Sequence, residues 1–561
     1  MNTEKDSERA ASSLGSIMDE GFAVDNHLSP GNFQSRNKPE QLAWFRDAAF
    51  GLFIHWSVDS QLGCVISHSL VGASDDYVDR YFHDLPKTLN PKEWDFDHLA
   101  ELAKCAGFQY AMLTTKHHNG FCLWDTKTTD FGIMNTPCHR DLVADYVAAF
   151  RRQGIRVGLY FSPEDFHFLY ERGEYITRSP LQPYSEGVYG AYRALLQEQL
   201  VELLTNYGPI DALFFDGGDH ETAVGEDGLT LQQYCLDLSW QLQPDVLITR
   251  GAIPTPEQQL PGIGQDIAWE ACITLGTAWQ YQPTNEEYKT GLHCIRLIAE
   301  TRAKGGNLLL NIAPDANGAL CREQENILRE IALWGFINRE AVYEVRPWII
   351  TNEENIWLLR HKDKNDLYAV LFDVADWDRG TRREFVIKSA KIASGSMVSV
   401  LGQSGEVTEY RPDLDTKVYW EQREDGLHID AMNNQRVYCG TQWRNPLVLK
   451  ITGVTAAFDP LQVHTAGEPK IAGDTVELSA EVVSMGSFAR AQLSFEYREY
   501  RGFAFSTYDG DWLSSDKIEV DAPGHCVIRV SDMLPGTAYQ YRAVLSTDKN
   551  VMAGEIKILE V

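Results

Sequence analysis

Between about residues 48 and 343 the chain alternates between short apolar runs and longer amphipathic stretches, and this alternation restricts the fold more than any other feature. The apolar runs have no alternating polar residues, which is typical of strands buried on both faces in a parallel sheet. The amphipathic stretches have apolar residues at helical spacing. The expected strands are 48–56, 110–115, 157–166, 211–216, 245–251 and 307–318, with 266–276 as a further apolar segment; the expected helices are 97–108, 141–155, 193–208, 232–243, 291–306 and 322–343.

This series contains at least six β-then-α units in one uninterrupted run and predicts an α/β fold, a closed (β/α)8-like TIM barrel over residues 36–345. An open, doubly wound sheet is the alternative. The sequence argues against it, because no GxGxxG turn follows the first strand and polar residues come at nearly every strand end. These residues are His55, His117, His118, Glu164, Asp165, Asp216, Arg250, Glu270, Asn311 and Asp315.

The segments on either side of the expected barrel have a different character. Residues 1–35 are polar and Ser-rich, which is typical of a mobile tail. Short alternating apolar segments predict a β-sandwich at 346–452 and a second all-β unit at 453–561. In the second unit, the phrase LPGTAYQYRAVL (534–545) resembles the late strands of fibronectin type III or immunoglobulin-like domains, where a Tyr near a strand start bonds back to the backbone.

Charge and composition limit the partners of the chain. A formal net charge of −30 argues against nucleic acid or an anionic membrane as a partner. No run of eighteen apolar residues occurs, and the N-terminus lacks the basic start and apolar core of a signal peptide. The 10 cysteines stand singly without CxxC pairs, which favours a reducing compartment. We therefore expect a cytoplasmic protein, or a periplasmic or secreted one if a signal was removed; a homo-oligomer is left open.

The stretch DALFFDGGD (211–219) supplies the first candidate for chemistry. Its apolar run ends abruptly in Asp216 and two glycines, so Asp216 is expected at the carboxyl end of a buried strand. Active sites of (β/α) barrels lie at that end of the strands. The alternative is that Asp216 only caps the following turn or helix.

A glycosidase of the retaining type needs a second carboxylate beside the first. Glu270 is the first candidate, since the neighbouring Trp269 offers an apolar wall that raises a carboxyl pKa. Glu286 and Glu287 are alternatives on a more polar loop. Glu164 and Asp165 also follow a strand, and any of these residues could be an ordinary exposed carboxylate.

The adjacent His117 and His118 allow three interpretations. They could bind sugar hydroxyls as neutral imidazoles, ligate a metal together with His55 and Asp216, or have a structural role. The metal interpretation is weakened because the first strand ends in a single histidine rather than an HxH pair. Arg250 could hold a substrate hydroxyl or a carboxylate, or form a structural ion pair.

Several motifs together resemble those of glycoside hydrolase family 29, the retaining α-L-fucosidases. They are WFRDAAFGLFIHWSV, DYVDRYF, AGFQYAMLTTKHHNGFCLWDTKTTDF, VGLYFSPEDF, DALFFDGG, WEACITLGTAWQY and GGNLLLNIAPDANG, and they span about residues 40–345 in order. The resemblance implies Asp216 as nucleophile and Glu270 as acid/base. It also implies a fucose pocket formed by His55, His117, His118, Tyr160 and Arg250, with Trp279 lining it, and no metal or organic cofactor.

The chain departs from this pattern at one place. Where many relatives carry a Glu and a Trp after the first strand, the loop CVISHSLVG (64–72) places Val65 and His68. A modified fucose or a related 6-deoxy or galacto-configured sugar therefore stays open as substrate. The expected function is an exo-acting retaining α-L-fucosidase that hydrolyses terminal α-L-fucosides of oligosaccharides or polysaccharides. The alternatives are a metal-dependent barrel hydrolase that uses the histidines, and a catalytically silent fucose-binding protein.

Overall fold

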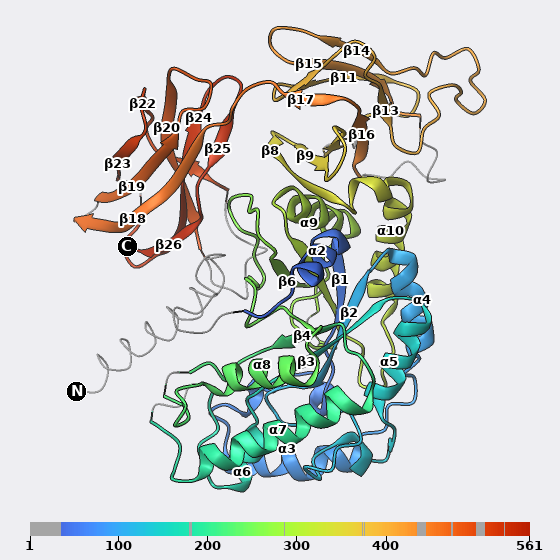
Figure 1. Cartoon of the computed structure of the whole chain (residues 1–561), viewed down its shortest axis with the longest axis vertical. Helices are drawn as coiled ribbons and strands as arrows, with labels where there is room; N and C mark the ends of the chain where they lie inside the picture. The colour runs from blue at the N-terminus through green and yellow to red at the C-terminus, as the bar shows by residue number, and fades with distance from the viewer. Residues whose placement is uncertain are drawn as a thin grey trace.

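The computed structural model describes residues 35–178, 182–220, 222–284, 286–372, 374, 376–434, 445–472, 475–500, 511–531 and 533–561. Three units follow one another along the chain (Figure 1). An α/β unit, coloured blue to yellow-green, is joined to two β units coloured yellow-orange and orange-red. The tail expected at residues 1–35 lies, apart from its last residue, outside the described residues.

The first unit is built on a curled sheet of seven parallel strands in the order β5-β4-β3-β2-β1-β7-β6. Its strands coincide with the predicted apolar runs, and nearly every strand residue is buried because helices cover the sheet. The strands are β1 (Phe50–Ile54), β2 (Tyr110–Lys116), β3 (Arg156–Phe161), β4 (Ala212–Phe215), β5 (Leu247–Ile248), β6 (Glu270–Thr274) and β7 (Asn307–Ile312).

The eightfold repeat expected from the sequence is incomplete in the described residues. Instead of an eighth strand with its own helix, the segment 254–258 runs parallel to β6 directly after β5. Its backbone bonds to β6 through Pro254 O, Pro256 O and Gln258 N, at 3.1, 3.1 and 2.9 Å. Two prolines in this segment remove backbone donors, which explains why its pairing stays irregular.

Several helices of the barrel begin where the sequence places side-chain caps. Asp95, Asp141, Thr230 and Thr290 each accept a hydrogen bond from a backbone N–H in the first turn of the following helix. The helices are α2 (Pro39–Ala48), α3 (Asp75–Thr88), α4 (Phe96–Ala106), α5 (Leu142–Arg152), α6 (Phe166–Glu171), α7 (Val188–Asn206), α8 (Leu231–Leu242), α9 (Gly291–Ala303) and α10 (Arg322–Asn338), with short 3-10 turns η1 (Val58–Gln61), η2 (His68–Leu70), η3 (Ile133–Asn135) and η4 (Arg339–Ala341).

The second unit consists of antiparallel sheets, as the alternating pattern predicts. The sheets are β13-β16-β10-β9-β8, β11-β15-β14 and β12-β17. Residues of this unit such as Leu359, Val370 and Val448 belong to the same buried apolar cluster as the barrel helices, so the two units share a core. The strands are β8 (Val345–Glu353), β9 (Ile356–His361), β10 (Leu367–Leu371), β11 (Arg382–Ile387), β12 (Ala390–Ile392), β13 (Val398–Val400), β14 (Tyr419–Gln422), β15 (Leu427–Met432), β16 (Leu447–Ile451) and β17 (Val454–Ala456).

The third unit has an apolar core of its own and two antiparallel sheets, β18-β19-β23 and β21-β20-β24-β25, with β22 and β26 paired to the second sheet. Tyr539, at the start of β24, accepts a hydrogen bond from Leu534 N at 2.9 Å, the backward contact expected from the sequence. The strands are β18 (Gln462–Ala472), β19 (Thr475–Ser484), β20 (Ala491–Glu499), β21 (Leu513–Ser514), β22 (Ile518–Val520), β23 (Gly524–Val530), β24 (Ala538–Ser546), β25 (Val551–Ala553) and β26 (Lys557–Glu560).

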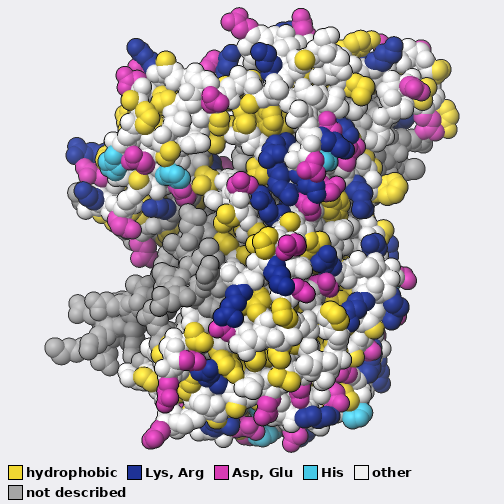
Figure 2. All heavy atoms as spheres, in the orientation of Figure 1, with side chains coloured by type: hydrophobic (Ala, Val, Ile, Leu, Met, Phe, Trp, Pro, Cys, Tyr) yellow, Lys and Arg dark blue, Asp and Glu magenta, His cyan; other side chains and the backbone are white. Residues whose placement is uncertain are grey.

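Charged side chains gather where the barrel meets the second unit, over α2, β8 and β9 (Figure 2). Asp47 pairs there with Arg346 at 2.8 Å and with Lys362 at 2.6 Å. Within the described part of the chain, none of the helices combines the length and apolar character that a membrane crossing requires.

Candidate active site

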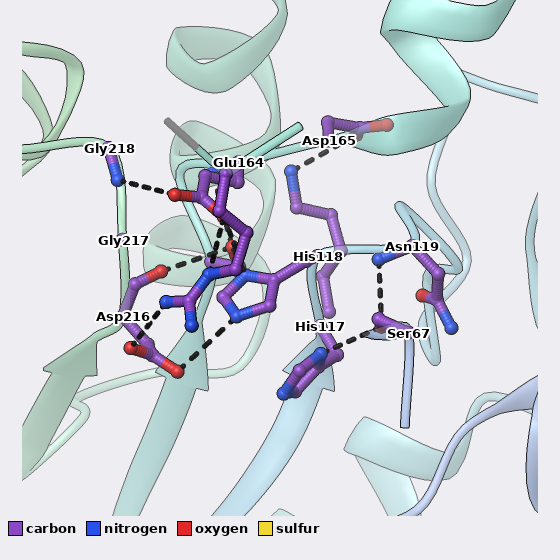
Figure 3. Close-up of polar contacts among 12 residues, drawn as sticks. Ser67, His117, His118, Asn119, Glu164, Asp165, Asp216, Gly217 and Gly218 are labelled. Carbon is purple, nitrogen blue, oxygen red and sulfur yellow. Dashed lines mark hydrogen bonds and ion pairs between the residues drawn. The ribbon is translucent and has the colours of Figure 1, made fainter. Parts of the chain in front are cut away.

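The candidate site lies at the carboxyl ends of the barrel strands, above an aromatic layer inside the barrel. Phe53, Tyr160 and Phe214 are buried there, with ring centroids 5.0 to 5.8 Å apart. These rings fill the barrel and form the floor of the site. Asp216 follows β4 directly and stands at the carboxyl end of this strand (Figure 3).

The chain can turn after Asp216 only because Gly217 has no side chain. Gly217 has φ +82°, and a Cβ there would lie 2.5 Å from Glu164 Oε1. Glu164 Oε1 in turn accepts a hydrogen bond from Gly218 N at 3.3 Å. The glycines predicted to close the strand thus bring the Glu164 carboxylate against the turn and fix the position of Asp216.

Asp216 is held as a carboxylate by its surroundings. Tyr160 donates a hydrogen bond to Oδ2 at 2.8 Å, while Arg250 and Arg178 each bring a nitrogen to 3.6 Å from Oδ1. Burial raises the pKa of Asp216, but the charges of Arg250 and Arg178 outweigh it and hold the pKa well below its usual range. An ionised carboxylate with 16% of its side chain exposed can act as a nucleophile or stabilise positive charge.

Three histidines predicted for the site surround Asp216 and are neutral. His55 Nδ1 lies 2.6 Å from Asn311 Oδ1, His117 Nδ1 lies 2.7 Å from Ser67 Oγ, and His118 Nδ1 lies 2.6 Å from Ser162 Oγ. Burial lowers the pKa of His55 to about 4 and takes those of His117 and His118 well below the usual value. Neutral imidazoles offer one donor and one acceptor nitrogen, which suits sugar hydroxyls.

Trp279 and Arg250 are the remaining residues predicted for the site. Both contact a carboxylate, Glu257, that was not predicted from the sequence. The Trp279 ring lies 4.9 Å from the His55 ring, and its indole N–H donates to Glu257 Oε1 at 3.0 Å. Arg250 Nη1 pairs with Glu257 Oε2 at 2.8 Å while its Nε faces Asp216. One guanidinium therefore joins Asp216 and Glu257, two carboxylates from separate strand ends.

The structure does not bring Glu270 to Asp216. Glu270 is the first residue of β6 and pairs with Asn307, the first residue of β7, so it lies at the amino end of the strands. Its side chain is fully buried and accepts a hydrogen bond from Tyr110, the first residue of β2. Asp216 instead follows Phe215, the last residue of β4, at the opposite end of the strands. Glu270 is part of the barrel core.

The other carboxylates considered from the sequence have different environments. Glu286 accepts hydrogen bonds from Thr277 N at 2.6 Å and from the Thr277 hydroxyl at 2.9 Å, which fixes a surface loop, and Glu287 is exposed. Asp165 caps α6 and pairs with the buried Lys116 at 3.1 Å. Glu164 is buried behind Asp216, where it pairs with Arg178 and His220.

The loop that departs from the family pattern supplies a fourth imidazole. The His68 ring lies 6.1 Å from that of His117 and 5.7 Å from that of His118. Burial and the neighbouring Arg178 lower the pKa of His68 to about 4, so this ring is also neutral. Val65, by contrast, is 46% exposed and points to solvent.

A parallel barrel that carries two carboxylates above its strands supplies the two groups that a glycoside hydrolase requires. The α-L-fucosidase family model matches residues 22–340. The chain belongs to this family, glycoside hydrolase family 29, as the motifs indicate.

The parts of known α-L-fucosidases that align with this chain make up most of the length of each relative. The α-L-fucosidase of Branchiostoma floridae is 28% identical over 376 residues, 59% of this chain and 79% of the relative. The tissue α-L-fucosidase of Mus musculus is 26% identical over 423 residues, 67% and 87% of the two chains.

Solved structures share the fold. The α-L-fucosidase isoenzyme 1 of Paenibacillus thiaminolyticus has a TM-score of 0.57 at 27% identity, covering 74% of this chain and 98% of its own. A family 29 α-L-fucosidase of Bacteroides thetaiotaomicron has a TM-score of 0.59 at 22% identity, covering 76% and 98%. The latter likeness shows the fold alone.

Proposed function

We propose that the chain is an exo-acting retaining α-L-fucosidase that hydrolyses terminal α-L-fucosides. The observation that carries the proposal is the pairing of Asp216 and Glu257 through Arg250, at the carboxyl ends of the strands. Hydrolysis with retention of the anomeric configuration needs one carboxylate that attacks the anomeric carbon and a second that donates a proton to the leaving oxygen and later accepts one from water. Glu257 takes the proton-transfer role expected for Glu270, because Glu270 is sealed in the barrel core.

In the first step, Asp216 attacks the anomeric carbon and the bond to the leaving oxygen breaks. The ionised state that Arg250 and Arg178 stabilise is the form that attacks. Tyr160 donates to Oδ2 and orients the carboxylate for the attack. The product is a β-fucosyl enzyme, and the leaving oxygen takes a proton from Glu257.

In the second step, Glu257 removes a proton from water, which attacks the anomeric carbon and releases α-L-fucose with Asp216 restored. The indole N–H of Trp279 and the guanidinium of Arg250 hold one oxygen each of the Glu257 carboxylate. They orient the side chain for both transfers. A covalent intermediate has been trapped in the Bacteroides thetaiotaomicron relative, which supports the same sequence of steps here.

The pocket residues have complementary roles in the proposal. His55, His117 and His118 bind ring hydroxyls through their neutral imidazoles, and Trp279 offers an apolar face to the sugar. Fucosylated oligosaccharides or polysaccharides are the proposed substrates. Because His68 adds a further imidazole to the pocket, a panel of modified and linkage-defined fucosides, scored for released sugar, would identify the preferred one.

Azide rescue tests both roles through the configuration of the product. Asp216→Ala should lose turnover of an aryl α-L-fucoside, and added azide should restore it and give the β-fucosyl azide. Glu257→Ala should still form the fucosyl enzyme from an activated fucoside, and azide should then give the α-fucosyl azide. Parent activity in Asp216→Ala would overturn the proposal.

The two alternative functions have their own tests. A metal-dependent hydrolase would lose activity after exhaustive chelation, whereas the proposed mechanism routes no step through a metal. A silent binding protein would bind L-fucose in a titration without releasing sugar from any fucoside of the panel.

A further inference from the structure

His117, His118 and Asp216 are arranged as a set of metal ligands as well as a sugar site (Figure 3). One ligand atom from each residue lies within 4.8 Å of the other two. His117 and His118 come from the end of β2 and Asp216 from the end of β4, so the rigid barrel fixes their positions.

In each of the two imidazoles, Nδ1 contacts a serine hydroxyl, which leaves Nε2 as the nitrogen for a metal ion. Serine hydroxyls lie at Nδ1 of His117 and of His118, at 2.7 and 2.6 Å. Such outer contacts orient metal-ligating histidines. Nε2 of His118 is buried and has no hydrogen-bond partner among the described residues, yet it lies 3.6 Å from Asp216 Oδ2. Two ligands of a tetrahedral zinc ion, each about 2.1 Å from the metal, stand about 3.4 Å apart.

We propose that these three side chains form an inhibitory site for a divalent cation of intermediate softness, with zinc as the representative ion. Two imidazoles and one carboxylate, with water as fourth ligand, are a common zinc environment. The bound ion would occupy Oδ2 of Asp216 and the nitrogens that face the sugar, so cation and fucoside would exclude each other. The inhibitory role rests on the proposed function; the binding site does not.

The charges around Asp216 set limits on this site. Arg250 and Arg178 lie 3.6 Å from Oδ1 and oppose a dication, but Oδ2 faces His118 on the other side. The two arginines repel all divalent cations to the same extent. Nitrogen ligands, however, favour zinc or copper over magnesium and calcium. We therefore expect binding of zinc and no binding of magnesium.

Isothermal titration of ZnCl2 into the chelator-treated full chain tests the site. The background is Cys105→Ser, since Cys105 is an exposed thiol that could bind zinc. The expected result is one zinc per chain, displaced by excess L-fucose, with affinity at least about tenfold lower in His118→Gln and in Asp216→Asn. His83→Gln, which removes a surface histidine, is the matched control and should bind normally.

The outcomes separate this inference from the proposed function. Absence of zinc binding, or binding that His118→Gln and Asp216→Asn leave unchanged in folded protein, would overturn the site. Activity lost on chelation and restored by zinc would overturn its inhibitory role. Heat of binding is measured without turnover, so a chain that binds zinc at this site but cleaves no fucoside refutes only the proposed function.

Discussion

Glu257 and Glu270 are the same residue type in two different surroundings, and the surroundings decide what each can do. Glu257 faces the site and contacts Arg250 and Trp279, whereas Glu270 is fully buried against Tyr110. Only a carboxyl group that reaches the leaving oxygen can transfer a proton to it.

Leaving-group dependence distinguishes the two glutamates. Glu257→Gln should lower kcat about 10²- to 10⁴-fold on a fucosyl disaccharide, because the leaving sugar oxygen must be protonated. The variant should change the first step little for dinitrophenyl α-L-fucoside, whose leaving group needs no proton. Glu270→Gln is the matched control and should affect both substrates equally and weakly; a selective loss in Glu270→Gln instead would restore the original assignment.

Glu270 itself should make stability depend on pH. Burial raises its pKa to about 7 from 4.5, so the folded state holds a proton that the unfolded chain releases between these values. The contribution is fully present below pH 4.5 and is lost as pH rises towards 7, on the order of 3 kcal/mol. Glu270→Gln keeps a neutral group of the same shape. Its melting temperature should exceed that of the parent at pH 8 and match it near pH 4.5; an equal difference at both values would contradict this.

The sequence could not separate these two glutamates. Apolar residues stand on both sides of Glu270, so the pattern cannot say whether it begins or ends the strand. Glu257 lies in the proline-containing segment PTPEQ, which has no strand periodicity. Its place beside β6 depends on pairing with a distant strand. By contrast, Asp216 and His55 follow uninterrupted apolar runs, and their positions at the strand ends could be predicted.

At the scale of elements, the turn after β4 links backbone geometry to the site. Gly217→Ala should destabilise the fold by about 1–3 kcal/mol, because φ +82° strains an L-residue and its Cβ would displace Glu164. Since Asp216 precedes this turn, kcat should also fall. The measurements are thermal unfolding and turnover of an aryl fucoside. In the control Gly190→Ala, the new Cβ in α7 meets nothing within 4 Å, and stability should be unchanged or higher.

Most elements of the barrel could be predicted, and the exceptions have a physical reason. Six expected helices and seven apolar segments correspond to α4, α5, α7 to α10 and β1 to β7. Their boundaries follow from caps and glycines close in sequence. The segment that takes the place of an eighth strand, residues 254–258, could not be predicted. It follows β5, which has only two residues, and its position depends on tertiary backbone hydrogen bonds to β6.

At the scale of the whole molecule, the three units are linked in different ways. The second unit shares an apolar core with the barrel, and Asp47 adds ion pairs to Arg346 and Lys362 across the junction. The third unit has a separate core and meets the barrel at Gly262, where the backbone of residues 554–556 lies against it. The sequence predicts the units from their patterning but not this contact, since it joins segments far apart in the chain.

This contact lies on the chain segment that carries Glu257, which leads to a prediction about activity. A Cβ at Gly262 would lie 2.9 Å from Gly554 O and 3.0 Å from Ile556 N, backbone atoms that cannot rotate away. Gly262→Ala should therefore push the third unit from the barrel at a cost of about 1–3 kcal/mol. Hydrogen exchange at residues 554–556 should rise.

The matched control is Gly264→Ala, two residues further on, whose Cβ would meet only Thr351 Cγ2 at 3.5 Å and Lys304 Cα at 3.9 Å. If the third unit holds the Glu257 segment in place, Gly262→Ala should lower kcat/KM, which reports the first step, on a fucosyl disaccharide and leave kcat/KM on dinitrophenyl α-L-fucoside unchanged, while Gly264→Ala spares both. An equal loss on both substrates would mean that the displacement reaches Asp216 as well. Unchanged kinetics together with faster exchange would show that the third unit is attached to the barrel without influencing proton transfer.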